Sequence, residues 1–477
     1  MNIEILKTKE IAILGYGREG KSTLRFLKNI GARDITILDK NIETIENIED
    51  EDIICIWWNS YLDSLSDFDI IFKSPGVCPY NDELAPYKEK FISQTQIFYE
   101  TYPGKVIAVT GTKGKSTTST LIYLSLKEAG YNVKLVGNIW NPVFDEIDII
   151  PFINKSLSST WLGKKLGEVS EEIYDFIIYE MSSYMLEGFI PKTYISVFNN
   201  IYNCHLDWHR GFENYKNAKL NILRNSEYAL INFEFKDFDE VKTISSNTQF
   251  FWIDGDFSYK NNWFYIADER VLEDENIVLL WEHNRKNIAW VLGVIYRATG
   301  KDIEKTIWAL KKVISTFEWL PHRMEKVGTF KGITFINDAI ATTPESTLAA
   351  IKTFSPDIGT LFLGGYDSGF IYTELEKNIE LGNIENLVLF PDTGYKIFTQ
   401  DIENKSEEIP FQIQKNGRII NILKTRSMET AVKFAYEYTQ EGKIALLSNA
   451  SQSFSLWKSY EVKGNLFKEL VIKYSSL

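Results

Sequence analysis

The chain has 477 residues, of which 44% are hydrophobic and 25% are charged, as in an ordinary globular protein. This length suggests about three domains. The 52 basic and 65 acidic side chains give a formal charge of −13, which argues against nucleic-acid binding through a broad basic face. The three cysteines form no CxxC pair, so the sequence predicts neither a disulfide framework nor a four-cysteine zinc site.

No run of about 18 continuous apolar residues occurs, and the first residues lack the pattern of a secretory signal. We therefore expect a cytoplasmic protein without membrane contact. Histidine is scarce, so the places where it occurs are informative. The four histidines are His205, His209, His283 and His322.

Short apolar runs alternate with helical patterns, which is typical of parallel α/β sheets. Strands are expected at 11–14, 35–38, 69–72, 106–109, 175–179, 194–198, 333–336, 359–363, 386–390 and 443–447, with short antiparallel strands within 233–279. Helices are expected at 22–29, 283–298 and 302–315. Breaks near 101–104 and 317–321 predict three domains, at 1–102, 103–318 and 319–477.

The first glycine-rich loop, Gly15-Tyr-Gly-Arg-Glu-Gly-Lys-Ser22, fits both the dinucleotide fingerprint and the nucleotide-hydrolase pattern. Asp39 ends the second expected strand, where a Rossmann-like site places a ribose or base contact. We therefore interpret the loop as holding the diphosphate of a bound nucleotide. Two alternatives remain open: a glycine turn needed only for strand–helix packing, and the cofactor site of a nicotinamide-dependent dehydrogenase.

The second glycine-rich loop spans Val109 to Thr117 and keeps the core Gly114-Lys115-Ser116 between an expected strand and a helix. It misses the strict hydrolase spacing, because Val109 stands where the first glycine belongs. Lys115 is expected to reach the β- and γ-phosphates, and the Ser116 hydroxyl to bind Mg²⁺. Glu180, at the end of a later strand, is the candidate for a further oxygen ligand. The alternative for Glu180 is a solvated strand end.

Two further positions have ordinary interpretations when taken alone. Lys219 has the pattern of an exposed helix lysine. His205 and His209 flank Asp207 and form a possible transition-metal site. We favour instead a functional His205 and a structural His209.

Several short motifs occur together along the chain. They are Gly111-Thr-Lys-Gly-Lys-Ser-Thr117, Glu180-Met-Ser-Ser183, His205-Leu-Asp-Trp-His209, Lys219, His283-Asn284 with Asn287, Leu320-Pro-His-Arg-Met-Glu325, Asn337-Asp-Ala-Ile-Ala-Thr342 and Leu447-Ser-Asn-Ala-Ser451. This combination resembles the Mur ligases, ATP-dependent enzymes that add amino acids to the UDP-muramyl precursor of peptidoglycan. The match covers essentially the whole chain and is nearest to the branch that adds glutamate to UDP-N-acetylmuramoyl-L-alanine.

The resemblance implies a three-domain α/β fold. A Rossmann-like UDP-binding domain would be followed by a P-loop ATPase domain, with a parallel sheet plus a small antiparallel sheet, and by a Rossmann-like C-terminal domain. It also implies ATP and two Mg²⁺ as cofactors, a monomeric enzyme, and a role in cell-wall synthesis and hence in cell shape and division. The substrates would be UDP-N-acetylmuramoyl-L-alanine and glutamate.

The same resemblance implies residue roles. The UDP-substrate would be bound by Gly15, Gly17, Arg18, Gly20, Asp39, Ser74, Pro75, Gly76 and Asn138. ATP would be bound by Gly111, Thr112, Lys113, Gly114, Lys115, Ser116, Thr117, Asn287, Arg323 and Asp338. The metal region would comprise Ser116, Glu180, His205 and a carbamylated Lys219, with Lys115, His205 and Lys219 as the catalytic residues. Thr342, Thr343 and Ser448 would bind the amino acid.

The sequence departs from the family pattern at three places. Ile340 stands where the glutamate-adding branch often has a lysine that contacts the incoming amino acid, and Ser368 occupies another position that is often basic. Trp140 replaces a glycine after Gly137-Asn138. D-Glutamate remains the expected substrate, with L-glutamate or another amino acid as the alternative. A nucleotide-gated scaffold without ligase activity is a further alternative that Ile340 suggests.

Overall fold

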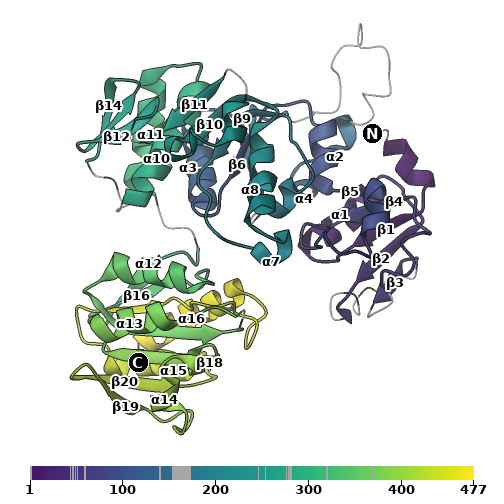
Figure 1. The fold of residues 1–477 in the computed structure, drawn as a ribbon. Coiled ribbons are helices and arrows are strands. Elements are labelled where there is room, and N and C mark those ends of the chain that lie inside the picture. The colour runs from purple at the N-terminus through teal and green to yellow at the C-terminus, as the bar shows by residue number, and fades with distance from the viewer. Residues whose placement is uncertain are drawn as a thin grey trace. The chain divides into compact units, whose positions relative to one another are not determined.

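The computed structural model describes residues 3–42, 45, 48, 50, 52–57, 61–138, 141–152, 173–244, 247–252, 254–275, 277, 282–317, 321–367 and 369–476. These residues form an α/β protein with three sheets (Figure 1). The chain divides into two compact units, Met1–Phe317 and Glu318–Leu477. The first unit contains two of the sheets and the second unit contains the third. None of the described helices is long and apolar enough to cross a membrane.

The N-terminal sheet is parallel, with the strand order β3-β2-β1-β4-β5. Its strands are β1 (Ile11–Leu14), β2 (Ile35–Asp39), β3 (Ile54–Trp57), β4 (Ile70–Lys73) and β5 (Phe91–Ile92). The helices of this part are α1 (Arg18–Asn29), α2 (Gln94–Thr101) and the 3-10 turns Ile3–Thr8 and Ala85–Lys90. Helix α1 begins four residues before the predicted start, so Arg18 and Glu19 belong to its first turn.

The second sheet has the order β14-β13-β12-β11-β10-β9-β6-β8-β7. Its strands are β6 (Val106–Thr110), β7 (Val133–Gly137), β8 (Phe176–Glu180), β9 (Thr193–Phe198), β10 (Ser226–Asn232), β11 (Thr248–Phe251), β12 (Phe257–Lys260), β13 (Trp263–Ile266) and β14 (Glu269–Glu273). Its helices are α3 (Lys115–Glu128), α4 (Val143–Glu146), α6 (Ser183–Leu186), α7 (Leu206–His209), α8 (Phe212–Leu220), α9 (Asp239–Lys242), α10 (Glu282–Ala298) and α11 (Ile303–Thr316), with 3-10 turns at Asn221–Leu223 and Phe233–Phe235.

The predicted antiparallel strands within 233–279 are present only in part. Strands β12, β13 and β14 are antiparallel, but β11 pairs parallel with β10, so the prediction was wrong for β11. The reason is the connection: α9 carries the chain back before β11 starts. The antiparallel strands continue the parallel sheet through a single residue pair, Phe251 with Phe257.

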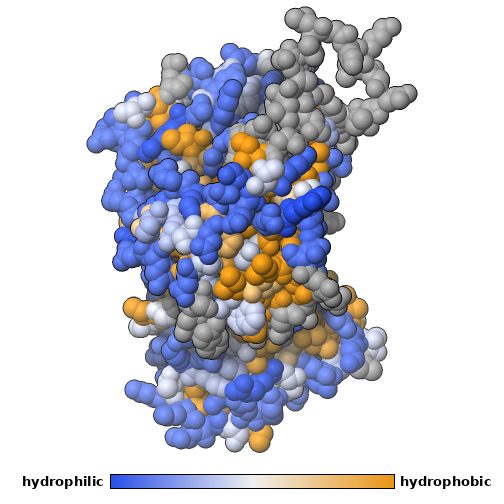
Figure 2. Space-filling view, turned by 90° about the vertical axis from the view of Figure 1, so that its right-hand side faces the viewer, coloured by the Kyte–Doolittle hydropathy of each residue, from blue (hydrophilic) through white to orange (hydrophobic). Residues whose placement is uncertain are grey.

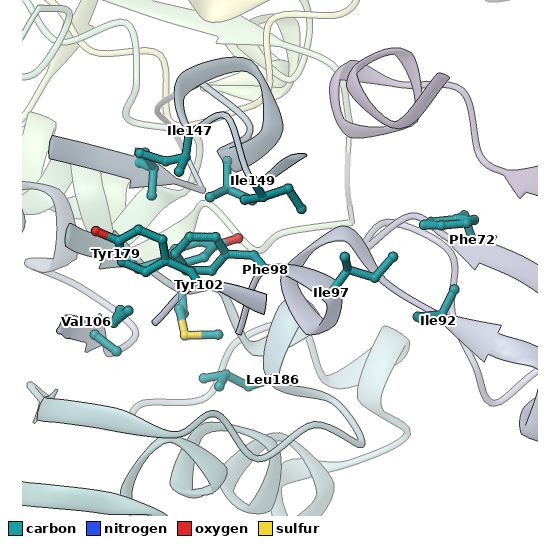
Figure 3. Packing of buried hydrophobic residues seen from close by; sticks show 14 of the residues in the cluster. Phe72, Ile92, Ile97, Phe98, Tyr102, Val106, Ile147, Ile149, Tyr179 and Leu186 are labelled. Carbon is teal, nitrogen blue, oxygen red and sulfur yellow. The ribbon is translucent and has the colours of Figure 1, made fainter. Parts of the chain in front are cut away.

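The two sheets of the first unit share one hydrophobic core, which Figure 3 shows in close-up. Phe72 and Ile92 come from the N-terminal sheet, and α2 extends this apolar surface towards the second sheet. The Phe98 ring on α2 stacks on Tyr102 at 5.2 Å and meets the Tyr179 ring of β8 edge-on at 5.6 Å. The shared core explains why residues 1–317 pack as one unit. The predicted boundary at 102/103 stays a prediction.

The second unit contains a mixed sheet with the order β15-β16-β21-β17-β18-β20-β19. Its strands are β15 (Glu325–Phe330), β16 (Ile333–Asn337), β17 (Ile358–Gly365), β18 (Asn386–Asp392), β19 (Phe411–Lys415), β20 (Arg418–Lys424) and β21 (Ile444–Leu447). Its helices are α12 (Pro344–Phe354), α13 (Thr373–Leu381), α14 (Thr399–Ile402), α15 (Met428–Tyr438) and α16 (Tyr460–Ser475), with a 3-10 turn at Gly394–Lys396. The five inner strands are parallel, and the edge strands β15 and β19 are antiparallel.

Figure 2 colours one face of the molecule by the hydropathy of its residues. The face in Figure 2 is mostly hydrophilic, with hydrophobic residues gathered in its middle part.

Candidate active site

The second glycine-rich loop connects buried strand β6 to helix α3. Gly114 precedes α3 with φ +79°, and a Cβ there would lie 2.8 Å from Asn287 Oδ1, so only glycine fits without strain. The Lys115 ammonium donates hydrogen bonds to the carbonyl oxygens of Gly111 (2.9 Å) and Thr112 (3.2 Å). Backbone N–H groups and a lysine therefore gather at the start of α3, which is the arrangement that binds phosphate.

Two asparagines after strand β9 support this loop. Asn200 Oδ1 accepts a hydrogen bond from the Lys113 N–H (2.9 Å), and its amide donates to the Lys113 carbonyl (3.0 Å). Asn199 lies close to Gly111: a Cβ added to Gly111 would come within 2.7 Å of the Asn199 Cβ. The sequence analysis missed this pair, although two asparagines directly after a buried strand could have indicated it.

Glu180 contacts both Asn138 and the second glycine-rich loop, which is called the P-loop from here on. It is buried at the end of β8 and accepts hydrogen bonds from Ser116 Oγ (3.2 Å), Ser119 Oγ (3.3 Å) and Asn138 Nδ2 (2.8 Å). The interpretation of Glu180 as a solvated strand end is therefore wrong. Thr118 also contacts Asn287 Oδ1 (3.5 Å), so Asn287 lies at the same loop.

The donors near Glu180 fit a hard cation. Carboxylate and hydroxyl oxygens are the ligands that Mg²⁺ prefers, and Mg²⁺ is commonly held by one or two carboxylates together with substrate phosphates. Over the described ranges, no group of three or more His, Cys, Asp and Glu side chains could hold a metal ion by itself. The carboxylate of Glu180 and the hydroxyl groups of Ser116 and Ser119 beside it are donors that fit a cation bound together with a nucleotide.

Lys219 on α8 is buried rather than exposed, so its interpretation as an ordinary exposed lysine is wrong. Its Nζ donates to the Gly111 carbonyl (2.9 Å) and lies 3.4 Å from Thr110 Oγ1. Burial, and then the neighbouring Lys115 cation, lower the pKa of Lys219 well below its usual value. A lowered pKa favours the uncharged amine, which is the nucleophilic form that reaction with CO₂ requires.

His205 precedes α7 in a left-handed conformation, with φ 54°. Burial is the largest cause that lowers its pKa to about 4, and the cations of Lys219 and Lys115 add to it. The imidazole is therefore neutral at pH 7, which is the form that binds a metal ion.

His209 is fully buried, and both of its ring nitrogens lie near polar groups, although Nδ1 makes no hydrogen bond among the described residues. Its Nε2 lies 3.0 Å from Ser183 Oγ, and its Nδ1 lies 3.3 Å from Glu187 Oε2. Tyr80, from the N-terminal part of the chain, donates to Glu187 Oε1 (2.8 Å). These contacts support the structural interpretation of His209, because neither nitrogen is directed at Asp207.

Replacing His209 by alanine is expected to lower the free energy of unfolding by about 2–4 kcal/mol, because the change leaves Ser183 and Glu187 without their buried partner. Tyr80→Phe removes one outer hydrogen bond and should cost about 1 kcal/mol. Urea unfolding followed by tryptophan fluorescence measures both. An H209A protein as stable as the wild type would show that His209 does not support the fold.

The first glycine-rich loop borders a cavity of about 380 Å³. The predicted UDP-site residues that line it are Gly15, Gly17, Arg18, Asp39, Ser74, Pro75, Gly76 and Asn138. Gly20 does not line it, and a Cβ there would come within 2.2 Å of the Gly15 carbonyl oxygen, so this glycine serves strand–helix packing. The sequence analysis missed five lining residues, namely Glu19, Val77, Ser182, Tyr184 and Met185.

Polar contacts shape the rim of this cavity. The Asp39 carboxylate accepts hydrogen bonds from the N–H groups of Tyr16 (2.6 Å) and Asn41 (2.8 Å). Ser74 Oγ donates to the Gly15 carbonyl (2.6 Å). Strands β1, β2 and β4 therefore present their carboxyl ends to one hollow, where ligands of parallel α/β sheets bind.

In the second unit, Asp338 follows β16 and is buried beside Arg323 and Ser448. Ser448 Oγ donates to Asp338 Oδ2 (2.9 Å), and the Met324 N–H donates to Oδ1 (3.1 Å). Burial raises the pKa of Asp338 to about 7, although these contacts and the Arg323 charge act in the opposite direction. Arg323 Nε is buried without a hydrogen-bond partner among the described residues.

Two of the three predicted amino-acid-binding residues use their hydroxyl groups in hydrogen bonds within the protein. Ser448 is fully buried with its hydroxyl on Asp338, and Thr343 Oγ1 caps α12 by accepting from the Ser346 N–H (3.3 Å). Thr342 is half-buried, and the backbone N–H of Ile340 donates to the His322 carbonyl (3.1 Å). Ser368 and Trp140 lie outside the described residues.

Comparisons with known proteins agree with this geometry. Residues 109–294 match the Mur ligase middle domain. The chain is 31% identical to UDP-N-acetylmuramoylalanine–D-glutamate ligase of Acetivibrio thermocellus, over 98% of the chain and 97% of the relative. The ligase of the same name from Clostridium tetani is 28% identical, with 98% and 97% covered. The MurF ligase of Thermotoga maritima, solved in complex with ADP, shares the fold at a TM-score of 0.53 and 17% identity, with 98% of this chain and 95% of that one covered. The chain therefore belongs to the Mur ligase family and is an ATP-dependent ligase that joins an acid to an amino acid.

Proposed function

We propose that this ligase adds D-glutamate to UDP-N-acetylmuramoyl-L-alanine, with ATP converted to ADP and phosphate. The observation that supports it most directly is the contact of Asn138 with Glu180. Asn138 lines the cavity beside the first loop, and Glu180 accepts a hydrogen bond from Ser116 of the P-loop. A sugar nucleotide in that cavity would extend its acyl end towards the nucleotide-binding loop. The names of the curated relatives support the same substrates.

The reaction requires two displacements. The carboxylate of the substrate attacks the γ-phosphorus of ATP, so that an acyl phosphate forms and ADP leaves. The amine of the amino acid then attacks the acyl carbon, and the tetrahedral intermediate releases phosphate and an amide. Lys115 would bind the transferred phosphate, because its ammonium lies at the start of α3. Two bound Mg²⁺ ions would neutralise phosphate charge and polarise the phosphoryl oxygens.

Lys219 and His205 would serve the cation region. The amine of Lys219 reacts with CO₂ to give a carbamate and a proton, which replaces a potential positive charge with a negative one. The neutral imidazole of His205 would act as a ligand. We also propose that Asn287, Arg323 and Asp338 contact ATP, and that Thr342, Thr343 and Ser448 lie near the amino acid. The enzyme would act as a monomer in the cytoplasm.

L-Glutamate is the second candidate. It is favoured by the run Gly15-Tyr-Gly-Arg-Glu-Gly-Lys-Ser22, which resembles that of the divergent ligase subfamily that includes L-glutamate users. Ile340, where the glutamate-adding branch often has a lysine, weakens the case for an acidic amino acid of either hand. An aliphatic side chain cannot pair with a carboxylate, so the amino acid would be recognised through hydroxyl and backbone N–H donors. Because the chain belongs to the Mur ligase family, we do not retain the alternative that the first glycine-rich loop is the cofactor site of a dehydrogenase.

Phosphate release should require ATP, UDP-N-acetylmuramoyl-L-alanine and glutamate together. We expect D-glutamate to give the highest kcat/KM in a panel of D- and L-amino acids, measured with a coupled phosphate assay and mass spectrometry of the product. Faster turnover with L-glutamate would assign the second candidate. ATP hydrolysis that does not depend on any amino acid would favour the scaffold alternative and contradict the proposal.

A further inference from the structure

Glu19 is a carboxyl group in the wall of the sugar-nucleotide cavity. It lies in the first turn of α1 and lines the cavity of about 380 Å³ together with Arg18 and Asn138. The same three residues line an adjoining hollow of about 60 Å³, which reaches Gly137 and Tyr179 of the second sheet. Glu19 therefore lies where a ligand would pass from the first glycine loop towards Asn138.

The surroundings of Glu19 disfavour its negative charge. Burial raises the pKa of Glu19 to about 7, and the Lys73 ammonium on β4 lowers it only in part. The titratable and charged groups around it are Arg18 on α1, Asp39 on β2, Lys73 on β4, Tyr179 on β8 and Tyr184 on α6. Among the described residues, no hydrogen bond occupies the Glu19 carboxyl oxygens. The group is thus poised between its two protonation states and has a free donor position when protonated.

A diphosphate in this cavity would favour the protonated form of Glu19 over the carboxylate. A carboxylate and a phosphate repel each other at short range in a partly desolvated site, whereas a carboxylic acid donates a hydrogen bond to a phosphate or sugar oxygen. We propose that Glu19 recognises the sugar nucleotide as a neutral carboxylic acid, so that at mildly alkaline pH substrate binding takes up about one proton from solvent and product release returns it. This inference rests on the proposed function, because it requires a sugar nucleotide in the cavity.

Lys73 is the competing source of a proton. Burial lowers the pKa of Lys73 to about 8, and the nearby carboxylates of Glu19 and Glu187 act against this. Its ammonium already donates to the Val77 carbonyl (3.0 Å), and Lys73 does not line the cavity. Proton uptake by Lys73 would persist when Glu19 is replaced by glutamine, and uptake by Glu19 would not.

Titration calorimetry of the full chain with UDP-N-acetylmuramoyl-L-alanine tests the inference. The carboxylate and the diphosphate diester of this probe stay ionised across the range used. The wild type should take up about one proton at about pH 8, seen as a dependence of the binding enthalpy on the ionisation enthalpy of the buffer. Its Kd should rise about 30-fold from about pH 6 to about pH 8.5, because only the protonated fraction binds.

The variants separate the possible outcomes. Glu19→Gln, which keeps a donor, should bind with a Kd that hardly changes with pH and without proton uptake, while Glu89→Gln at an exposed position should behave as the wild type. A wild type without proton uptake overturns the inference without reference to any variant. Uptake that persists in E19Q assigns the proton to another group and also overturns it. A wild type that does not bind the probe at all contradicts the proposed function itself.

Discussion

Replacing Lys219 by alanine is expected to lower kcat by about 10³-fold, which corresponds to the loss of about 4 kcal/mol of charge stabilisation. The side chain is buried against Gly111, and its lowered pKa favours the amine that forms a carbamate. If Lys219 is carbamylated as proposed, alanine removes that carbamate, and the cation region loses an anionic partner near Glu180. Steady-state phosphate release under saturating substrates measures the loss. Lys216→Ala on the same helix, where the lysine pairs with Glu213 and Glu240, is the matched control.

Two further results would test the carbamate itself. Added bicarbonate should not restore K219A, because alanine has no amine to react. ¹³C-labelled bicarbonate should give a carbamate signal in the wild type that is absent from K219A and present in K216A. Turnover of K219A close to that of the wild type would contradict the role of Lys219, and full activity without a carbamate signal would contradict the modification.

The local elements of this fold follow well from the sequence. Buried apolar runs such as Ile11–Leu14 and Val106–Thr110 were predicted within one residue, because continuous apolar strands bounded by glycine leave few alternatives. The eight predicted residues that border the first cavity lie at the ends of four strands. The rule that parallel strands bind ligands at their carboxyl ends brings together those of β1, β2 and β4, whereas Asn138 follows β7 of the second sheet.

The burial of charged side chains could not be predicted. Lys219 and Glu180 have the local pattern of exposed residues, and only the packing of α8 and β8 against the P-loop shows that both are enclosed. Glu19 was missed for a related reason: α1 starts at Arg18, before the helical pattern becomes regular, and so turns the side chain into the cavity wall. Strand direction at β11 also depends on a connection, through α9, that no local pattern specifies.

Replacing Lys115 by alanine is the second change that we expect to lower kcat strongly. The Lys115 ammonium is held over the loop by the carbonyl oxygens of Gly111 and Thr112, at the start of α3 where phosphate charge would accumulate. Lys115→Ala removes a cation aimed at the transferred phosphate, and we expect kcat to fall by about 10³-fold. Lys127→Ala, at an exposed position in the last turn of the same helix, should retain wild-type rates.

The conservative variant distinguishes charge from shape at this position. Lys115→Arg keeps the positive charge but replaces a point charge with a planar fork, so it should recover only part of the activity. If the ammonium only held the loop together, K115A would melt at a lower temperature, and adding nucleotide to saturation would restore its rate. If the ammonium stabilises transferring phosphate, K115A should melt close to the wild type and stay slow at saturating ATP, because an interaction made mainly in the transition state lowers kcat rather than raising KM alone. Thermal unfolding and initial rates measured on the same preparations decide between these outcomes, and wild-type kcat in K115A would show that this lysine takes no part in phosphoryl transfer.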